Sequence, residues 1–135
     1  MPYTATKSIL LIAGLIGAVV GSAILISPVA FHGTTGIELG SNPSLMSEVR
    51  APGGGLLAIG LLIMAGAFVS RLTFTALVVA ALVYVSYGAS RIFSMAVDGM
   101  PHSTLVIVAG LEIVIGVLCI RALVGYRGLA DQPAV

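Results

Sequence analysis

Three side chains capable of chemistry recur at seven-residue intervals in one apolar stretch of this sequence. Tyr84, Arg91 and Asp98 belong to the segment YVSYGASRIFSMAVD. On a helix of 3.6 residues per turn, this spacing places them close to one line, with Tyr87 beside it. An unpaired arginine inside a membrane-spanning helix costs roughly 2.5–3.5 kcal/mol. We therefore expect acidic side chains of other helices to meet Arg91.

The acidic residues come from two other apolar stretches. Glu112 lies near the middle of the last stretch, and Glu48 and Arg50 open the second one. At 1.5 Å per residue, Arg91 lies ~10 Å from the end of its helix at Asp98, and Glu112 lies ~13 Å from the start of its own helix. The two residues therefore share one level. We predict an ion pair between Arg91 and Glu112, surrounded by Glu48, Arg50 and Asp98.

Carboxyl groups in unequal surroundings are suited to acid–base chemistry on a lipophilic substrate. Glu112 is predicted to lie within the bundle, whereas Glu48 and Asp98 lie nearer its surface, so these three are the candidate catalytic acids and bases. An arginine can hold an anionic group or stabilise an oxyanion, and a tyrosine can line a cavity and donate a hydrogen bond. The candidate ligand-binding residues are Arg91, Arg50, Tyr84 and Tyr87.

The composition is that of a membrane protein. Only 8% of the 135 residues are charged, against about 25% in ordinary globular proteins. Hydrophobic residues make up 59%, and the mean hydropathy is +1.16. A net charge of +1 provides no basic patch for nucleic acid. Cys119 is the single cysteine, so no disulfide can form within the chain. The sequence also predicts no metal site and no cofactor. We interpret Cys119 as a small buried hydrophobic residue.

Four apolar stretches predict one all-α domain over residues 1–135, an integral membrane four-helix bundle. The first stretch is longer than the core of a signal peptide, and Pro28 lies where a cleavage site needs a small residue, so we interpret this stretch as a span. The expected helices cover about 8–28, 48–70, 73–98 and 103–123, with an extracytoplasmic loop at 29–47.

Small residues recur every four positions in the first stretch, at Ala13, Gly17 and Gly21. This spacing lets membrane helices approach closely. We interpret it as a packing face, and the Gly17 and Gly21 face as a possible contact for a second copy or a membrane partner.

The basic residues are distributed unequally between the two ends of the predicted bundle. Lys7, Arg71, Arg121 and Arg127 fall at the end that holds both termini. Since positive residues are enriched in cytoplasmic loops, both termini are expected in the cytoplasm.

Two spaced motifs and one acid carry a resemblance to a known family. The chain has an ExRAxxGG element at residues 48–55, a GxxRxxSxxxDGxP element at residues 88–101, and Glu112 in the last stretch. It resembles the bacterial family labelled domain of unknown function 4345, which is similar in layout to the DoxX and DoxD group of four-helix membrane proteins. Pro52 departs from the residue expected in the first element. The resemblance implies the fold and a bacterial cytoplasmic (inner) membrane location, and supplies no activity.

Several functions remain open from the sequence. The first is an accessory or structural membrane subunit locked by its polar cluster. The second is a membrane enzyme, an isomerase, cyclase or hydrolase, acting on a lipophilic substrate, and the third is a small proton-coupled transporter. Quinone redox chemistry has less support, because there is no cysteine pair and no pair of intramembrane histidines. The expected partners are membrane lipids, a lipophilic small molecule, and a homo-oligomer or membrane protein; the protonation state of Glu112 stays open.

Overall fold

The chain is all-helical and carries four helices long and apolar enough to cross a membrane. A computed structural model describes residues 3–130, with side chains from Thr4 to Tyr126, and contains no strand in that range. The protein is therefore a multi-pass membrane protein. Its elements are α1 (Tyr3–Ile26), α2 (Pro28–Gly33), α3 (Pro43–Ala65), α4 (Ser70–Asp98) and α5 (Ser103–Ala130).

The helix bounds differ from the predicted ones most clearly at α3. This helix begins at Pro43 rather than at residue 48, because the Asn42 side chain caps it by accepting hydrogen bonds from the backbone N–H groups of Ser44 and Leu45, at 2.8 and 3.3 Å. Pro43 follows in the first turn, where its missing N–H costs nothing. Pro52 then lies inside the helix instead of near its start.

Several other bounds differ as well, among them the start of α1, at Tyr3 rather than residue 8. The short helix α2 lies at the start of the predicted 29–47 loop, and α3 ends at Ala65 rather than near residue 70. Helix α4 begins three residues earlier than expected, at Ser70, and α5 continues beyond residue 123 to Ala130. The side chain of Arg127 lies outside the described side chains.

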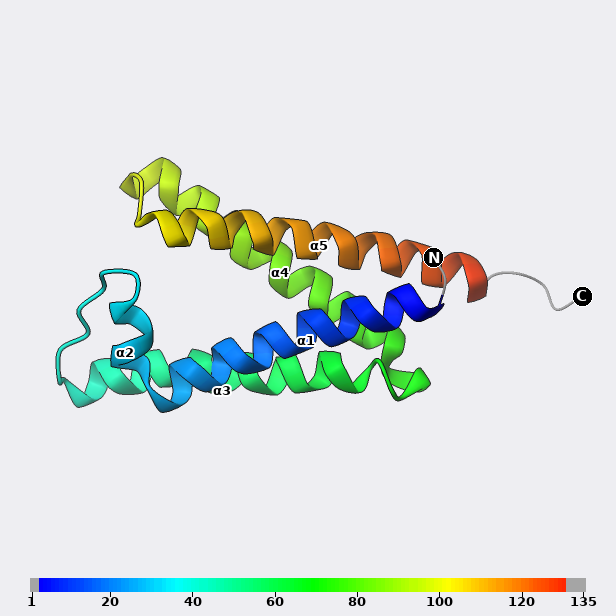
Figure 1. The fold of residues 1–135 in the computed structure, drawn as a ribbon, viewed down its shortest axis with the longest axis horizontal. Helices are drawn as coiled ribbons and strands as arrows, with labels where there is room; N and C mark the ends of the chain where they lie inside the picture. The colour runs from blue at the N-terminus through cyan, green and yellow to red at the C-terminus, as the bar shows by residue number, and fades with distance from the viewer. Residues whose placement is uncertain (1–2, 131–135) are drawn as a thin grey trace, which may run out of the picture.

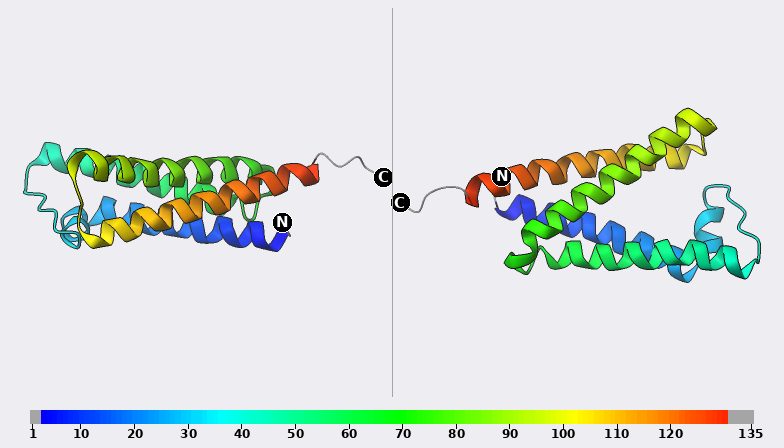
Figure 2. Two further views of the ribbon diagram at one scale, coloured as in Figure 1. Left: turned by 90° about the horizontal axis from the view of Figure 1, so that it is seen from above. Right: turned by 180° about the vertical axis from the view of Figure 1, so that it is seen from behind.

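The four long helices form two pairs, α1 with α3 and α4 with α5 (Figures 1 and 2). The pairs meet near the start of α1 and the end of α5, which we call the closed end. They diverge toward the loops at residues 34–42 and 99–102, which we call the open end (Figure 1). The sequence predicts four helices but not this divergence.

Glycines allow the close approach of α1 and α3. A Cβ atom added to Gly53 would lie 2.8 Å from the backbone nitrogen of Leu25, and one added to Gly60 would lie 2.8 Å from the carbonyl oxygen of Gly14. Gly17 and Gly21 also face α3, opposite Gly60 and Leu57. The predicted packing face is thus used within the chain, and a partner would need another surface.

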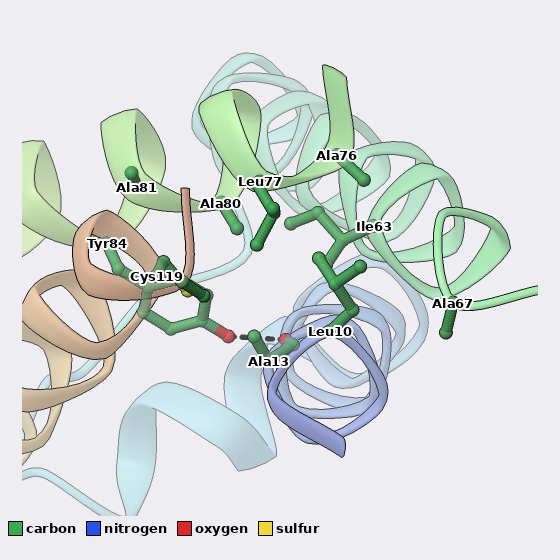
Figure 3. Close-up of a cluster of buried hydrophobic side chains, with 11 residues drawn as sticks. Leu10, Ala13, Ile63, Ala67, Ala76, Leu77, Ala80, Ala81, Tyr84 and Cys119 are labelled. Carbon is green, nitrogen blue, oxygen red and sulfur yellow. Dashed lines mark hydrogen bonds between the residues drawn. The ribbon is translucent and has the colours of Figure 1, made fainter. Parts of the chain in front are cut away.

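The core lies where the two pairs meet, and small side chains fill much of it (Figure 3). Leu10 and Ala13 of α1 meet Ile63 of α3, Leu77 of α4 and Cys119 of α5. Four of these five side chains are fully buried, and Ile63 is 1% exposed. Cys119 therefore packs as a small hydrophobe, as its sequence context predicts.

Candidate functional site

Arg91 of α4 and Glu112 of α5 are in direct contact. The Arg91 Nε atom donates a hydrogen bond to Glu112 Oε2 at 2.9 Å, and the side chains are 31% and 12% exposed. Counting residues along the two helices predicts this pair. It joins two neighbouring helices through a charge-assisted hydrogen bond.

Glycines on each helix bring α4 and α5 close together around this pair. A Cβ atom added to Gly88, three residues before Arg91, would lie 2.6 Å from Ile113 Cδ1. One added to Gly116, four residues after Glu112, would lie 2.7 Å from Val85 Cγ2. The Cβ atoms would also lie 3.2 Å from the backbone nitrogen of Ile113 and 3.1 Å from that of Val85, so the two helices are in close contact at the level of the Arg91–Glu112 bridge.

Tyr84 connects the two helix pairs. Its hydroxyl group donates a hydrogen bond to the carbonyl oxygen of Ala13 at 2.6 Å, and the side chain is 7% exposed (Figure 3). Tyr87 lies one turn further along α4 toward Arg91 and is 40% exposed. The two candidate tyrosines thus lie in different surroundings, and Tyr84 is the one held in the core.

Asp98 is bonded within its own helix. Its Oδ2 atom accepts a hydrogen bond from Ser94 Oγ at 2.9 Å, and both residues are exposed at the open end of α4. Asp98 is therefore a neighbour of the Arg91–Glu112 pair along the helix, without a direct bond to it among the described residues.

Arg50 contacts the end of α1 instead of Arg91 and Glu112. Its guanidinium group donates hydrogen bonds to the carbonyl oxygens of Leu25 and Ile26, the latter at 3.3 Å. These carbonyls belong to the last turn of α1, where intrahelical donors run out. Arg50 therefore caps α1, and Glu48 lies exposed on the same α3 segment.

The structure does not bring the five predicted charged residues into one cluster. Glu48 and Arg50 belong to the α1–α3 pair, whereas Arg91, Asp98 and Glu112 belong to the α4–α5 pair, and the two pairs diverge at the open end (Figure 1). Residue counting along a helix gives a level but no lateral position. Residues predicted to lie at one level are thus divided between the two helix pairs.

The site has little in common with a metal centre. No group of three or more His, Cys, Asp and Glu side chains within the described residues lies close enough to hold a metal ion. The candidate acids Glu48, Asp98 and Glu112 lie on three different helices, and Glu112 is the one that contacts an arginine.

The contacts of this region differ in how far the sequence predicts them. Backbone acceptors, such as the Ala13 carbonyl that binds Tyr84, carry no signal in the residue type. Gly88 and Gly116, by contrast, are readable in the sequence, because both lie on the faces of Arg91 and Glu112 and are small enough for close helix packing.

Comparison with known proteins gives the family. A family model described as "Domain of unknown function (DUF4345)" matches residues 5–123, which run from the first turns of α1 into α5. The chain belongs to the DUF4345 family. No curated protein and no solved structure matches the chain. The DUF4345 match extends through all four long helices, whereas similarity to the DoxX and DoxD group stays a prediction.

Proposed function

We propose that this protein is an accessory or structural membrane subunit of the bacterial cytoplasmic membrane. The observation that carries the proposal is the use of its polar side chains as ties between helices. Arg91 and Glu112 join α4 to α5, Tyr84 joins α4 to α1, and Arg50 joins α3 to α1.

Each tie is a hydrogen bond between two helices of an otherwise apolar protein. Between apolar helices in lipid, association depends on packing and on interhelical hydrogen bonds, because lipid tails are as apolar as leucine. Polar ties at defined positions therefore select one register of the helices. This role needs no substrate.

Acid–base catalysis has less support from the geometry. Glu112 is bonded to Arg91, Asp98 to Ser94, and Glu48 lies on the other helix pair. A pair of carboxyl groups acting on one substrate must face the same space. Proton-coupled transport has the same difficulty, since these acids form no continuous series across the protein among the described contacts.

A variant set at Arg91 and Glu112 tests the structural role. Arg91→Leu alone or Glu112→Met alone leaves a partly buried charge without its partner, and we expect each to lower the free energy of unfolding by about 1–3 kcal/mol. The double variant Arg91→Leu/Glu112→Met removes both charges, and we expect it to unfold close to the native temperature. Thermal unfolding in one detergent measures all three.

The biological readout uses a bacterial strain that lacks the gene. The double variant should complement the deletion as well as the native chain does, because a structural tie can be replaced by apolar packing. A double variant that is folded and inserted in the membrane but fails to complement would contradict the proposal, and would favour chemistry at Glu112.

A further inference from the structure

The Arg91–Glu112 pair leaves hydrogen-bonding capacity unused on both partners. A guanidinium group has five N–H donors, and within the described part of the chain only Nε is engaged, by Glu112 Oε2. The second carboxylate oxygen, Oε1, accepts no hydrogen bond from the described residues either. With Arg91 31% and Glu112 12% exposed, a free donor group and a free acceptor lie side by side at the protein surface.

The pair lies at a level that lipid headgroups reach. Helix α4 has 29 residues, so it is ~44 Å long and exceeds a ~30 Å hydrocarbon core by ~14 Å. Arg91 lies 20 residues after Arg71, or ~30 Å along α4, so the two arginines can lie at the two edges of the hydrocarbon core. The exposed Ser94–Asp98 hydrogen bond then lies beyond that core. An exposed arginine at this depth also draws phosphate groups and water toward it.

We propose that Arg91 and Glu112 together bind the zwitterionic headgroup of a phospholipid that carries a primary ammonium group. The terminal nitrogens of Arg91 donate hydrogen bonds to the lipid phosphate, and Glu112 Oε1 accepts one from the ammonium group. The ion pair has no net charge, so a purely anionic headgroup would gain from Arg91 and be repelled by Glu112. A headgroup with both signs satisfies both partners.

Helix α5 also presents an exposed apolar face to lipid. Ile107, Leu111, Val114 and Leu118 recur on α5 at spacings of four, three and four residues, which places them on one face. Their exposed fractions run from 39% to 64%. At about 100° per residue this face lies more than 90° around α5 from Glu112, so it contacts the acyl chains of the bilayer in general and adds no selectivity to headgroup binding.

Lipid retention by the native protein gives the first test. The purified chain is exchanged into detergent with equal amounts of phosphatidylethanolamine, phosphatidylcholine and phosphatidylglycerol, and bound lipids are counted by native mass spectrometry. We expect phosphatidylethanolamine to be retained over phosphatidylcholine by about fivefold, the factor that one net hydrogen bond supplies. N-methylation removes the three N–H donors and leaves the charge unchanged. Equal retention of these two lipids, or preferential retention of phosphatidylglycerol, would overturn the proposal.

Three variants assign the selectivity to residues. Glu112→Gln should abolish the preference for phosphatidylethanolamine and raise retention of phosphatidylglycerol, because Arg91 then carries an uncompensated charge. Arg91→Gln should lower retention of phosphatidylethanolamine and phosphatidylglycerol alike. The control is Arg71→Gln, which removes the same charge near the opposite end of α4 and should leave the preference unchanged.

The outcomes separate this proposal from the structural one. A folded Glu112→Gln variant that still prefers phosphatidylethanolamine over phosphatidylcholine would refute headgroup binding. An Arg71→Gln variant that loses this preference as fully as Glu112→Gln does would refute it too. If Arg91→Gln does not fold, the comparison of the three lipids on the native chain and on Glu112→Gln still decides. The complementation experiment has a different readout and can succeed or fail independently.

Discussion

Individual polar side chains in this protein act at specific contacts between helices. Arg91 reaches Glu112, Tyr84 reaches the carbonyl of Ala13, and Arg50 reaches the last carbonyls of α1. Two of these three contacts end on backbone oxygen atoms. A side chain that binds backbone fixes the position of a helix without requiring a particular residue on the other side, so such contacts tolerate sequence change at the acceptor.

Tyr84→Phe tests the contact that joins the two helix pairs. The change removes one buried hydroxyl group and its hydrogen bond to Ala13, and keeps the ring in the core. We expect the free energy of unfolding to fall by about 1 kcal/mol. Tyr87→Phe is the matched control on the same helix, since its side chain is 40% exposed, and it should change stability little. Equal effects of the two changes, measured by thermal unfolding in detergent, would show that the Tyr84 hydroxyl contributes nothing.

Within each helix pair, glycine packing sets the distance between the two helices. Gly53 and Gly60 of α3 approach the backbone of α1, and Gly88 and Gly116 do the same for α4 and α5. The regular spacing in α1 was readable from the sequence, because small residues four positions apart form one face. The sequence could not say which helix would occupy that face, since every helix here is apolar enough to do so.

Gly60→Ala tests the packing of α1 against α3. The added methyl group would overlap backbone atoms of Gly14 and Ala18, which cannot move without shifting α1. We expect a loss of about 1–3 kcal/mol of stability. Gly110→Ala is the matched control, since nothing lies within 4 Å of a Cβ atom there, and the higher helix propensity of alanine should leave stability unchanged or raise it by up to about 1 kcal/mol. A Gly60→Ala variant as stable as the native chain would contradict close contact between the backbones of α1 and α3 at this position.

Across the whole molecule, the sequence predicted the fold class and the level of the charged residues, and it missed their lateral arrangement. Long apolar stretches determine the spans, because each must be long enough to cross a bilayer. The predicted start of the second span at residue 48 was wrong, because the Asn42 cap starts one continuous helix at Pro43. Glu48 and Arg50 therefore lie inside α3 rather than at its start. Which helices pair depends on side-chain shape along their whole length, and no short motif encodes that. The sequence therefore predicted the contact between Arg91 and Glu112. It did not predict that Glu48 and Arg50 would lie on the other helix pair.

The distribution of basic residues predicts the orientation of the whole molecule in the membrane. Lys7, Arg71 and Arg121 lie toward the closed end, so the positive-inside rule predicts that this end faces the cytoplasm. Single cysteines in a Cys119→Ala background test this, because Cys119 is fully buried and its removal leaves the surface unchanged. Met100→Cys, at a position 75% exposed in the loop at residues 99–102, should react with a membrane-impermeant maleimide in intact cells. Ser70→Cys, in the exposed first turn of α4, should react only after lysis. The reverse pattern would place the open end, with Arg91 and Glu112, on the cytoplasmic side, and the lipids available to them would then be those of the inner leaflet.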